Sequence, residues 1–149
     1  DRFDLIYLDL TDPETPAGPL YTTAFFESCK RALASGGALV LHLGSPFHES
    51  QQVKNLSESL ASVFAQVHGY GLHIPLYGSY WGLAIASDEL NPRAFSADQI
   101  QERLEQRMSN ENQDSLQFYN ADIHGALFAL PTFYRRLMPV NEVNLEEVC

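Results

Sequence analysis

The stretch FDLIYLDLTDPETPAGPLY, residues 3–21, indicates the fold class. Its first part, up to Leu10, is a nearly continuous apolar run, which is typical of a parallel strand buried on both faces. Asp9 and Asp12 close this run, and prolines and a glycine then end the strand and stiffen the loop. Ligands bind at the carboxyl ends of strands in open α/β sheets, so this carboxylate pair is a candidate site. A turn in which both carboxylates bond nearby backbone N–H groups is an equally supported alternative.

Composition limits the classes of protein and partner. The chain has 149 residues, 45% hydrophobic and 19% charged, which predicts one globular domain. Nineteen acidic and nine basic residues give a formal charge of −10, which disfavours nucleic acid and suits cationic small molecules. Cys29 and Cys149 form no disulfide framework, which fits a reducing, cytoplasmic compartment. We expect no membrane segment, since no apolar run is long enough, and no metal, since the five histidines lack a ligand spacing.

The chain enters its first strand almost at once and does not begin with Met. We therefore expect it to be the later part of a longer protein. The pattern then predicts, in order, a helix over 21–33, a strand over 38–43, a helix over 49–67, strands over 71–77 and 81–87, a helix over 96–108 and a helix over 122–137 that Pro131 interrupts. Ser96 and Gln99 have the spacing of a capping box at the start of the helix over 96–108. Gly36 and Gly37 are interpreted as the stop of the first helix.

This order predicts an α/β fold. Two parallel βα units come first, and the short link between the last two strands favours an antiparallel hairpin. We interpret this as the C-terminal half of a Rossmann-like sheet of the class I methyltransferase type, followed by terminal helices. The opening half of such a sheet carries the glycine-rich turn that meets a nucleoside, and this sequence has no GxGxxG.

Four short motifs in the same order resemble the spermidine synthase family, the polyamine aminopropyltransferases. They are DLTDPETP at 9–16, HIPLY at 73–77, FYN at 118–120 with His124, and FALP at 128–131. The resemblance extends to about Leu137, so residues 1–137 are expected to be a partial catalytic domain and 138–149 an acidic tail. The stretches HIPLYGSYWGLAIASD and QERLEQRM also look like the thermospermine-synthase branch, which leaves the acceptor amine open.

The resemblance implies polyamine biosynthesis by aminopropyl transfer. The donor would be decarboxylated S-adenosylmethionine, a co-substrate and not a tightly bound cofactor. The acceptor would be a cationic diamine such as putrescine, and the products spermidine and methylthioadenosine. The full-length protein would be the enzyme, and we expect the isolated chain to be inactive. A homo-oligomer is also expected.

The resemblance also assigns roles to matching positions. Asp9 would be the catalytic carboxylate, and Tyr77 would orient the attacking nitrogen. Asp12 would anchor the amine, with Leu10 and Thr11 beside it on the substrate side. Pro16, Ala17 and Leu20 would line the nucleoside side. Two positions depart from the family: Thr15 replaces the usual Gly, and His42 replaces a common Gln. His42 is either a substrate-facing hydrogen-bonding residue or a histidine packed at the mouth of the sheet.

The proposed chemistry needs these residue types. An alkylamine has a pKa near that of Lys, about 10.4, so it is protonated at pH 7 and cannot attack. A carboxylate beside it accepts the proton as the carbon–nitrogen bond forms. Two alternatives stay open: a methyltransferase on the same sheet, which would use S-adenosylmethionine itself, and a non-catalytic polyamine-binding or assembly module.

Overall fold

A four-stranded mixed sheet organises the larger part of the structure. The computed structural model describes residues 2–11 and 15–140. These residues form two units: one contains the described residues up to Asn91 and from Leu130 onward, and the other is Pro92–Ala129. Of the predicted acidic tail, only residues 138–140 lie within the described part, so the boundary at Leu137 stays a prediction.

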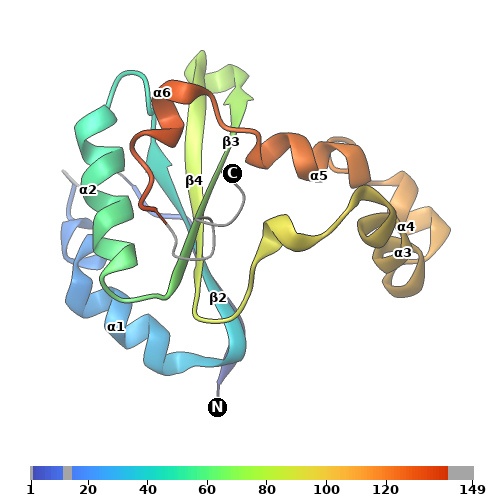
Figure 1. The fold of residues 1–149 in the computed structure, drawn as a ribbon, viewed down its shortest axis with the longest axis horizontal. Helices are drawn as coiled ribbons and strands as arrows, with labels where there is room; N and C mark the ends of the chain where they lie inside the picture. Colours follow the sequence, from blue (N-terminus) through green and yellow to red (C-terminus); the bar gives the residue numbers. More distant parts are fainter. Residues whose placement is uncertain (1, 12–14, 141–149) are drawn as a thin grey trace, which may run out of the picture. The chain divides into compact units, whose positions relative to one another are not determined.

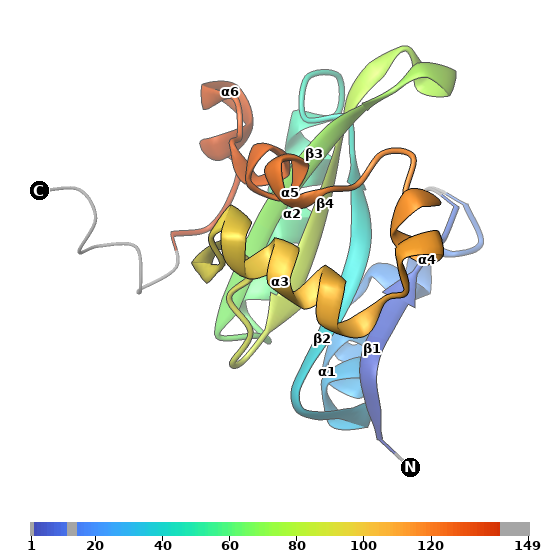
Figure 2. The ribbon, with the colours of Figure 1, turned by 90° about the vertical axis from the view of Figure 1, so that its right-hand side faces the viewer.

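The sheet has the strand order β1-β2-β4-β3. Its strands are β1 (Phe3–Leu8), β2 (Leu33–Gly44), β3 (Gln66–Ile74) and β4 (Ser79–Ser87). β1 is parallel to β2, and β4 lies antiparallel between β2 and β3. The helices α1 (Thr23–Ala32) and α2 (Ser50–Ala61) connect the strands and cover one face of the sheet (Figure 1, Figure 2). The predicted α/β fold with two parallel βα units and an antiparallel hairpin is confirmed.

β1 differs from its prediction as a strand buried on both faces. Phe3, Leu5 and Tyr7 are 55%, 58% and 57% exposed, whereas Ile6 and Leu8 pack against the core. The three exposed residues alternate along the strand, so they lie on one face of the sheet, whereas α1 and α2 cover the other face (Figure 1). The strand order also places β1 at the edge of the sheet, and within the described residues it pairs with β2 alone.

The interpretation of Gly36 and Gly37 as a helix stop is wrong. α1 ends at Ala32, and both glycines lie inside β2. Gly36 has a φ of +71°, and a Cβ on Gly37 would lie 3.0 Å from the carbonyl oxygen of Phe3. The pairing of β1 with β2 shifts register at this point, and residues without a Cβ allow the two backbones to approach there.

The predicted helix over 49–67 is too long, and the strand after it was predicted too late. α2 ends at Ala61, and β3 already begins at Gln66. Val63, Phe64 and Val67 continue the helical spacing of α2, but they contribute to the core from a turn and a strand. The hairpin itself is confirmed: the last β3–β4 pair is Ile74 with Ser79, and the turn contains a short 3-10 helix, η2 (Pro75–Tyr77).

The C-terminal segment of the first unit packs on strands that contain glycine. Tyr134 of α6 (Thr132–Arg135) is fully buried, and its hydroxyl donates to the carbonyl of Leu83 at 2.9 Å. A Cβ on Gly82 would lie 2.9 Å from that hydroxyl, so the ring fits only because the strand has a glycine there. Burial raises the pKa of the Tyr134 hydroxyl, which keeps it protonated and able to donate.

The second unit is helical. It contains η3 (Pro92–Ala94), α3 (Ala97–Arg107), α4 (Asn110–Asp114) and α5 (Ala121–Phe128). The capping box of Ser96 and Gln99 is confirmed, and Pro131 does separate α5 from α6, whereas α4 was not predicted. His124 accepts a hydrogen bond from the Tyr119 hydroxyl at 2.8 Å and donates to the carbonyl of Pro92 at 2.8 Å. The histidine of the FYN motif region therefore holds this unit together.

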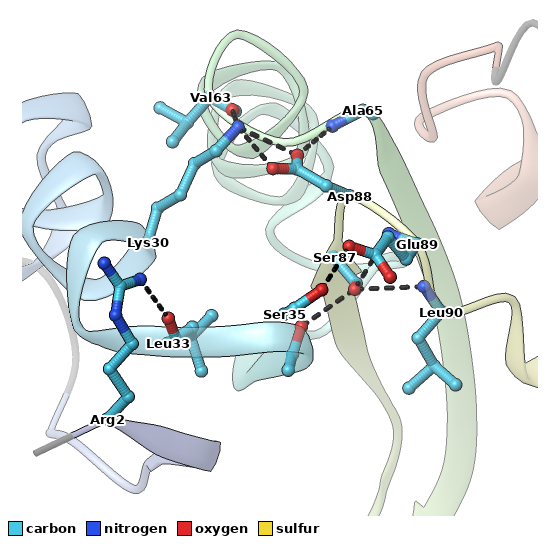
Figure 3. Close-up of polar contacts among 11 residues, drawn as sticks. Arg2, Lys30, Leu33, Ser35, Val63, Ala65, Ser87, Asp88, Glu89 and Leu90 are labelled. Carbon is cyan, nitrogen blue, oxygen red and sulfur yellow. Dashed lines mark hydrogen bonds and ion pairs between the residues drawn. The ribbon is translucent and has the colours of Figure 1, made fainter.

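A polar network ties the ends of the helices to the end of β4 (Figure 3). The Lys30 ammonium donates to the carbonyl of Val63 at 2.7 Å and forms an ion pair with Asp88 at 2.8 Å. The Ala65 N–H donates to the same carboxylate at 3.0 Å. Burial alone would raise the pKa of Asp88, but these hydrogen bonds and the charge of Lys30 lower it below its ordinary value of 3.8.

The lowered pKa of Asp88 predicts an acid-dependent loss of stability. The stabilisation is present above the unfolded pKa and is lost as the pH falls through the lower folded pKa. We expect Asp88→Asn to cost about 0.5 kcal/mol at neutral pH, because the pair is half exposed, and nothing at strongly acidic pH. Urea unfolding at several pH values measures this. Asp4→Asn is the control, and an equal effect of Asp88→Asn at every pH would contradict the prediction.

The exposed edge of β1 predicts self-association of the 149-residue chain. An unpaired edge strand with apolar side chains can pair with another copy. We expect light scattering to show oligomers, and the double variant Leu5→Lys/Tyr7→Lys to shift them to monomer. Leu76→Lys, at a position that is 87% exposed outside β1, should not change the distribution. A monomeric wild-type chain would contradict this expectation.

Candidate active site

Three residues predicted for catalysis or substrate binding lie at one end of the sheet. Asp9 directly follows β1, His42 lies near the end of β2, and Tyr77 lies in the turn between β3 and β4. Because β1, β2 and β3 run in the same direction, this is the carboxyl end of all three. The sheet therefore places at the same end three candidates that lie far apart in the sequence, and this is the end at which ligands bind in open α/β sheets.

The Asp9 side chain is exposed and available to a ligand. Within the described residues, no hydrogen bond or ion pair engages the Asp9 carboxylate. Among these residues, Asp9 therefore does not bond a nearby backbone N–H group, as the alternative of a capped turn would require. Asp12 lies outside the described residues, and its part in the pair stays a prediction.

The backbone after Asp9 is held by two side chains. The Nε2 atom of His42 lies 2.6 Å from the carbonyl oxygen of Leu10. The hydroxyl of Tyr21 donates to the carbonyl of Thr11 at 2.9 Å and lies 2.9 Å from the same Nε2. The Nδ1 atom of His42 is buried and has no hydrogen-bond partner among the described residues. His42 therefore packs at the mouth of the sheet, and one of its nitrogens remains unused.

A row of aromatic rings continues from His42. The ring of Trp81 stacks on His42 with 6.2 Å between centroids and an interplanar angle of 22°. The ring of Tyr77 lies 4.5 Å from that of Trp81, centroid to centroid. Trp81 is half-buried and Tyr77 is 54% exposed, so the row extends to the surface. An aromatic surface of this kind can bind methylene chains and cations.

The residues predicted for the nucleoside side lie on the loop after Asp9. Pro16 and Ala17 precede the 3-10 helix η1 (Gly18–Tyr21), which contains Leu20. Pro16 is exposed, whereas Ala17 and Leu20 are half-buried. The Thr15 hydroxyl accepts the Ala17 N–H at 3.3 Å, and Thr15 has a negative φ. Replacing the family's Gly by Thr15 therefore needs no strained backbone at this position.

Two residues of this site were not found from the sequence. The sequence pattern places Tyr21 at the start of a helix and Trp81 at the start of a strand. Both are large apolar residues at positions where core packing explains them. Only the structure shows that the Tyr21 hydroxyl and the Trp81 ring meet His42.

The first unit also has a groove at the other end of the sheet. Its volume is about 920 Å³, and it is lined by the start of β2, the end of α1 and the residues after β4. Its polar groups bond one another: Arg2 donates to the carbonyl of Leu33 at 2.9 Å, and Ser35 donates to Glu89 at 2.8 Å (Figure 3). We assign this groove a structural role and place the candidate active site at the carboxyl end.

The described residues give two further observations on metals and membranes. They contain no group of three or more His, Cys, Asp or Glu side chains that could hold a metal ion. No helix among them has both the length and the apolar character that crossing a bilayer requires.

The strand order and the site define a class of protein. A sheet with parallel strands, an inserted antiparallel strand and candidate residues at its carboxyl end is a Rossmann-like fold of the methyltransferase type. A family model described as the spermine/spermidine synthase domain matches residues 1–97. The chain therefore belongs to the spermine/spermidine synthase family, and the resemblance seen in the sequence is confirmed.

Curated relatives support the same family. The polyamine aminopropyltransferase of Nitrosomonas europaea is 43% identical over 138 residues, which are 93% of this chain and 41% of that protein. The enzyme of the same name from Sulfurisphaera tokodaii is 31% identical over 140 residues, 93% of this chain and 45% of that protein. The chain thus spans less than half the length of these relatives.

Solved structures agree with the fold. A spermidine synthase in complex with the transition state analogue AdoDATO matches with a TM-score of 0.78 and 26% identity, over 92% of this chain and 45% of that chain. The spermidine synthase of Thermotoga maritima, at 24% identity, matches with a TM-score of 0.73 over 92% of this chain and 44% of that chain. This second match supports the fold alone.

The ring row predicts that Tyr77 shields Trp81. Trp81 is the single tryptophan of the sequence, so its fluorescence reports this site alone in the 149-residue chain. We expect Tyr77→Ala to shift the emission to longer wavelength, because water reaches the indole. Leu76→Ala, in the same turn but 87% exposed, is the control and should leave the emission unchanged. Equal spectra for wild type and Tyr77→Ala would show that Tyr77 does not shield the Trp81 ring.

Proposed function

We propose that the full-length protein transfers an aminopropyl group from decarboxylated S-adenosylmethionine to a diamine such as putrescine, forming spermidine and methylthioadenosine. The observation that carries the proposal is Asp9, an exposed carboxylate at the carboxyl end of β1 in a chain of the spermine/spermidine synthase family. The names of the relatives and the AdoDATO complex of the structural neighbour support it.

The first role of Asp9 is to free the nucleophile. The substrate ammonium has a pKa of about 10.4, so freeing its lone pair at pH 7 costs about 4–5 kcal/mol. The Asp9 carboxylate accepts the proton as the nitrogen begins to bond to carbon. The same carboxylate holds the nitrogen in line with the propyl carbon, which reduces the entropy cost of the reaction.

The sulfonium of the donor completes the reaction. The amine nitrogen forms a bond to the propyl carbon while the carbon–sulfur bond breaks. The electron pair of that bond stays on sulfur, which becomes the neutral thioether of methylthioadenosine. Because the leaving group is neutral and stable, the reaction needs neither a metal ion nor a tightly bound cofactor.

The other candidates bind and orient. Tyr77 orients the attacking nitrogen, and Asp12 anchors an ammonium by a charge-assisted hydrogen bond. Leu10 and Thr11 form the backbone between the two carboxylates. His42 lies beside this backbone, with its Nε2 atom 2.6 Å from the carbonyl oxygen of Leu10.

The remaining partners follow from the same chemistry. Pro16, Ala17 and Leu20 line the nucleoside side of the donor. The acidic balance of the chain favours a cationic acceptor. We also propose that the full-length enzyme is a homo-oligomer and acts in the cytoplasm.

Replacing Asp9 tests the proposal in the full-length protein. Asp9→Asn keeps the shape of the side chain but removes the proton acceptor. We expect kcat for methylthioadenosine formation to fall by about 10²–10⁴-fold. Asp4→Asn, in the strand that precedes Asp9 and also exposed, is the matched control and should keep kcat within about twofold, because surface substitutions of this kind have small effects.

The alternatives give different results in the same assay. A polyamine-binding module would bind putrescine but form no methylthioadenosine, and a methyltransferase would prefer S-adenosylmethionine over its decarboxylated form. Either result, or an Asp9→Asn variant as fast as wild type, would contradict the proposal.

A further inference from the structure

The two peptide carbonyls that follow Asp9 are both bonded to side chains from other elements. The carbonyl of Leu10 meets His42 of β2, and that of Thr11 meets Tyr21 of η1. These two side chains also meet each other at 2.9 Å. The segment that carries Asp9 is thus attached at two successive peptide groups immediately after the carboxylate.

The protons of this arrangement can be assigned. A carbonyl oxygen only accepts, so the 2.6 Å contact to Leu10 requires a proton on Nε2 of His42. The Tyr21 hydroxyl uses its own proton for the carbonyl of Thr11, so its oxygen is an acceptor toward the same Nε2–H. The neutral imidazole is therefore the Nε2–H tautomer, with a lone pair on Nδ1.

Both side chains are fixed on their other sides. Tyr21 is 7% exposed and belongs to the hydrophobic core. His42 is packed against Trp81 on one side and lies edge-on to Tyr21, with 6.1 Å between centroids, on the other. The two donors are therefore held by the packed part of the unit, and they transmit that rigidity to an exposed segment.

We propose that Tyr21 and His42 are a positioning pair that aims the Asp9 carboxylate. Neither needs to touch the reacting atoms for this role: each donates to a peptide carbonyl within two residues of Asp9. The inference rests on the proposed function, because it assumes that Asp9 is the proton acceptor. It adds that aminopropyl transfer depends on a tyrosine hydroxyl that lies outside the predicted set of site residues.

A positioning role affects the kinetic constants differently from a binding role. Misplacing a catalytic group by about 1 Å can cost up to about 10²-fold in rate. Loss of the Tyr21 hydroxyl should therefore lower kcat, while KM for the diamine changes little, because the variant keeps every group that binds the substrate.

The central experiment uses Tyr21→Phe in the full-length protein. The ring still fills its core position, so the melting temperature should stay close to that of wild type. We expect kcat to fall about tenfold, with the KM of the diamine within about twofold. Tyr119→Phe is the matched control, since it removes a hydroxyl that also bonds an imidazole, that of His124 in the other unit. It should leave kcat within about twofold of wild type.

A double variant tests whether Tyr21 acts through Asp9. If it does, Asp9→Asn/Tyr21→Phe should be no slower than Asp9→Asn alone. Multiplied losses in the double variant, or a wild-type kcat in Tyr21→Phe, would overturn the inference while leaving the role of Asp9 intact. A fully active Asp9→Asn variant would instead overturn the proposed function itself, and these failures are therefore distinguishable.

Two substitutions at His42 separate its two nitrogens. A Gln side chain places an amide donor about where Nε2 lies, and an Asn side chain places an acceptor about where Nδ1 lies. For a positioning role, His42→Gln should lose less kcat than His42→Asn. The reverse order would overturn the inference and assign His42 to substrate binding alone.

A spectroscopic measurement tests the pair independently of activity. Nitrogen NMR of the neutral imidazole of His42 should show a proton on Nε2 and none on Nδ1. The opposite tautomer would break the bond to Leu10 and would also overturn the inference.

Discussion

The hydrogen bond from His42 to the carbonyl of Leu10 determines how the chain leaves β1. This bond joins β2 to the residues that follow the edge strand β1, directly after Asp9. The pairing of β1 with β2 keeps the His42 side chain close to the carbonyl of Leu10. The hydrophobic core, which includes Tyr21, keeps the Tyr21 hydroxyl in place. The proposed chemistry depends on this bond because an exposed carboxylate has little else to fix its direction.

Much of this arrangement could be predicted from the sequence. The apolar runs identified every strand, and the short link before Trp81 identified the antiparallel hairpin. The carboxyl-end rule placed Asp9 at the mouth of the sheet, and the family resemblance added His42 and Tyr77 as site residues. Ser96 with Gln99, and Pro131, were correctly interpreted because capping and the missing N–H of proline act locally.

The rest depended on long-range packing. Whether both faces of β1 are covered depends on which elements pack on the sheet, which an apolar run does not specify. The predicted helix over 49–67 extended past the end of α2 because three apolar residues continue its helical spacing. These residues, Val63, Phe64 and Val67, reach the core from a turn and a strand instead. Gly36 and Gly37 follow a helix, yet the φ of Gly36 and the close approach of Phe3 to Gly37 belong to a β-bulge. Tyr21 and Trp81 match core patterns, and their contacts with His42 are visible only in three dimensions.

The central claim is that Asp9 receives the proton of the attacking amine. The most direct test is a crystal structure of the full-length protein with methylthioadenosine and putrescine bound. The account predicts an Asp9 carboxylate oxygen about 2.6–3.2 Å from one putrescine nitrogen, with that nitrogen facing the sulfur of the nucleoside. A diamine bound away from Asp9, with another group at hydrogen-bond distance from its nitrogen, would contradict the account.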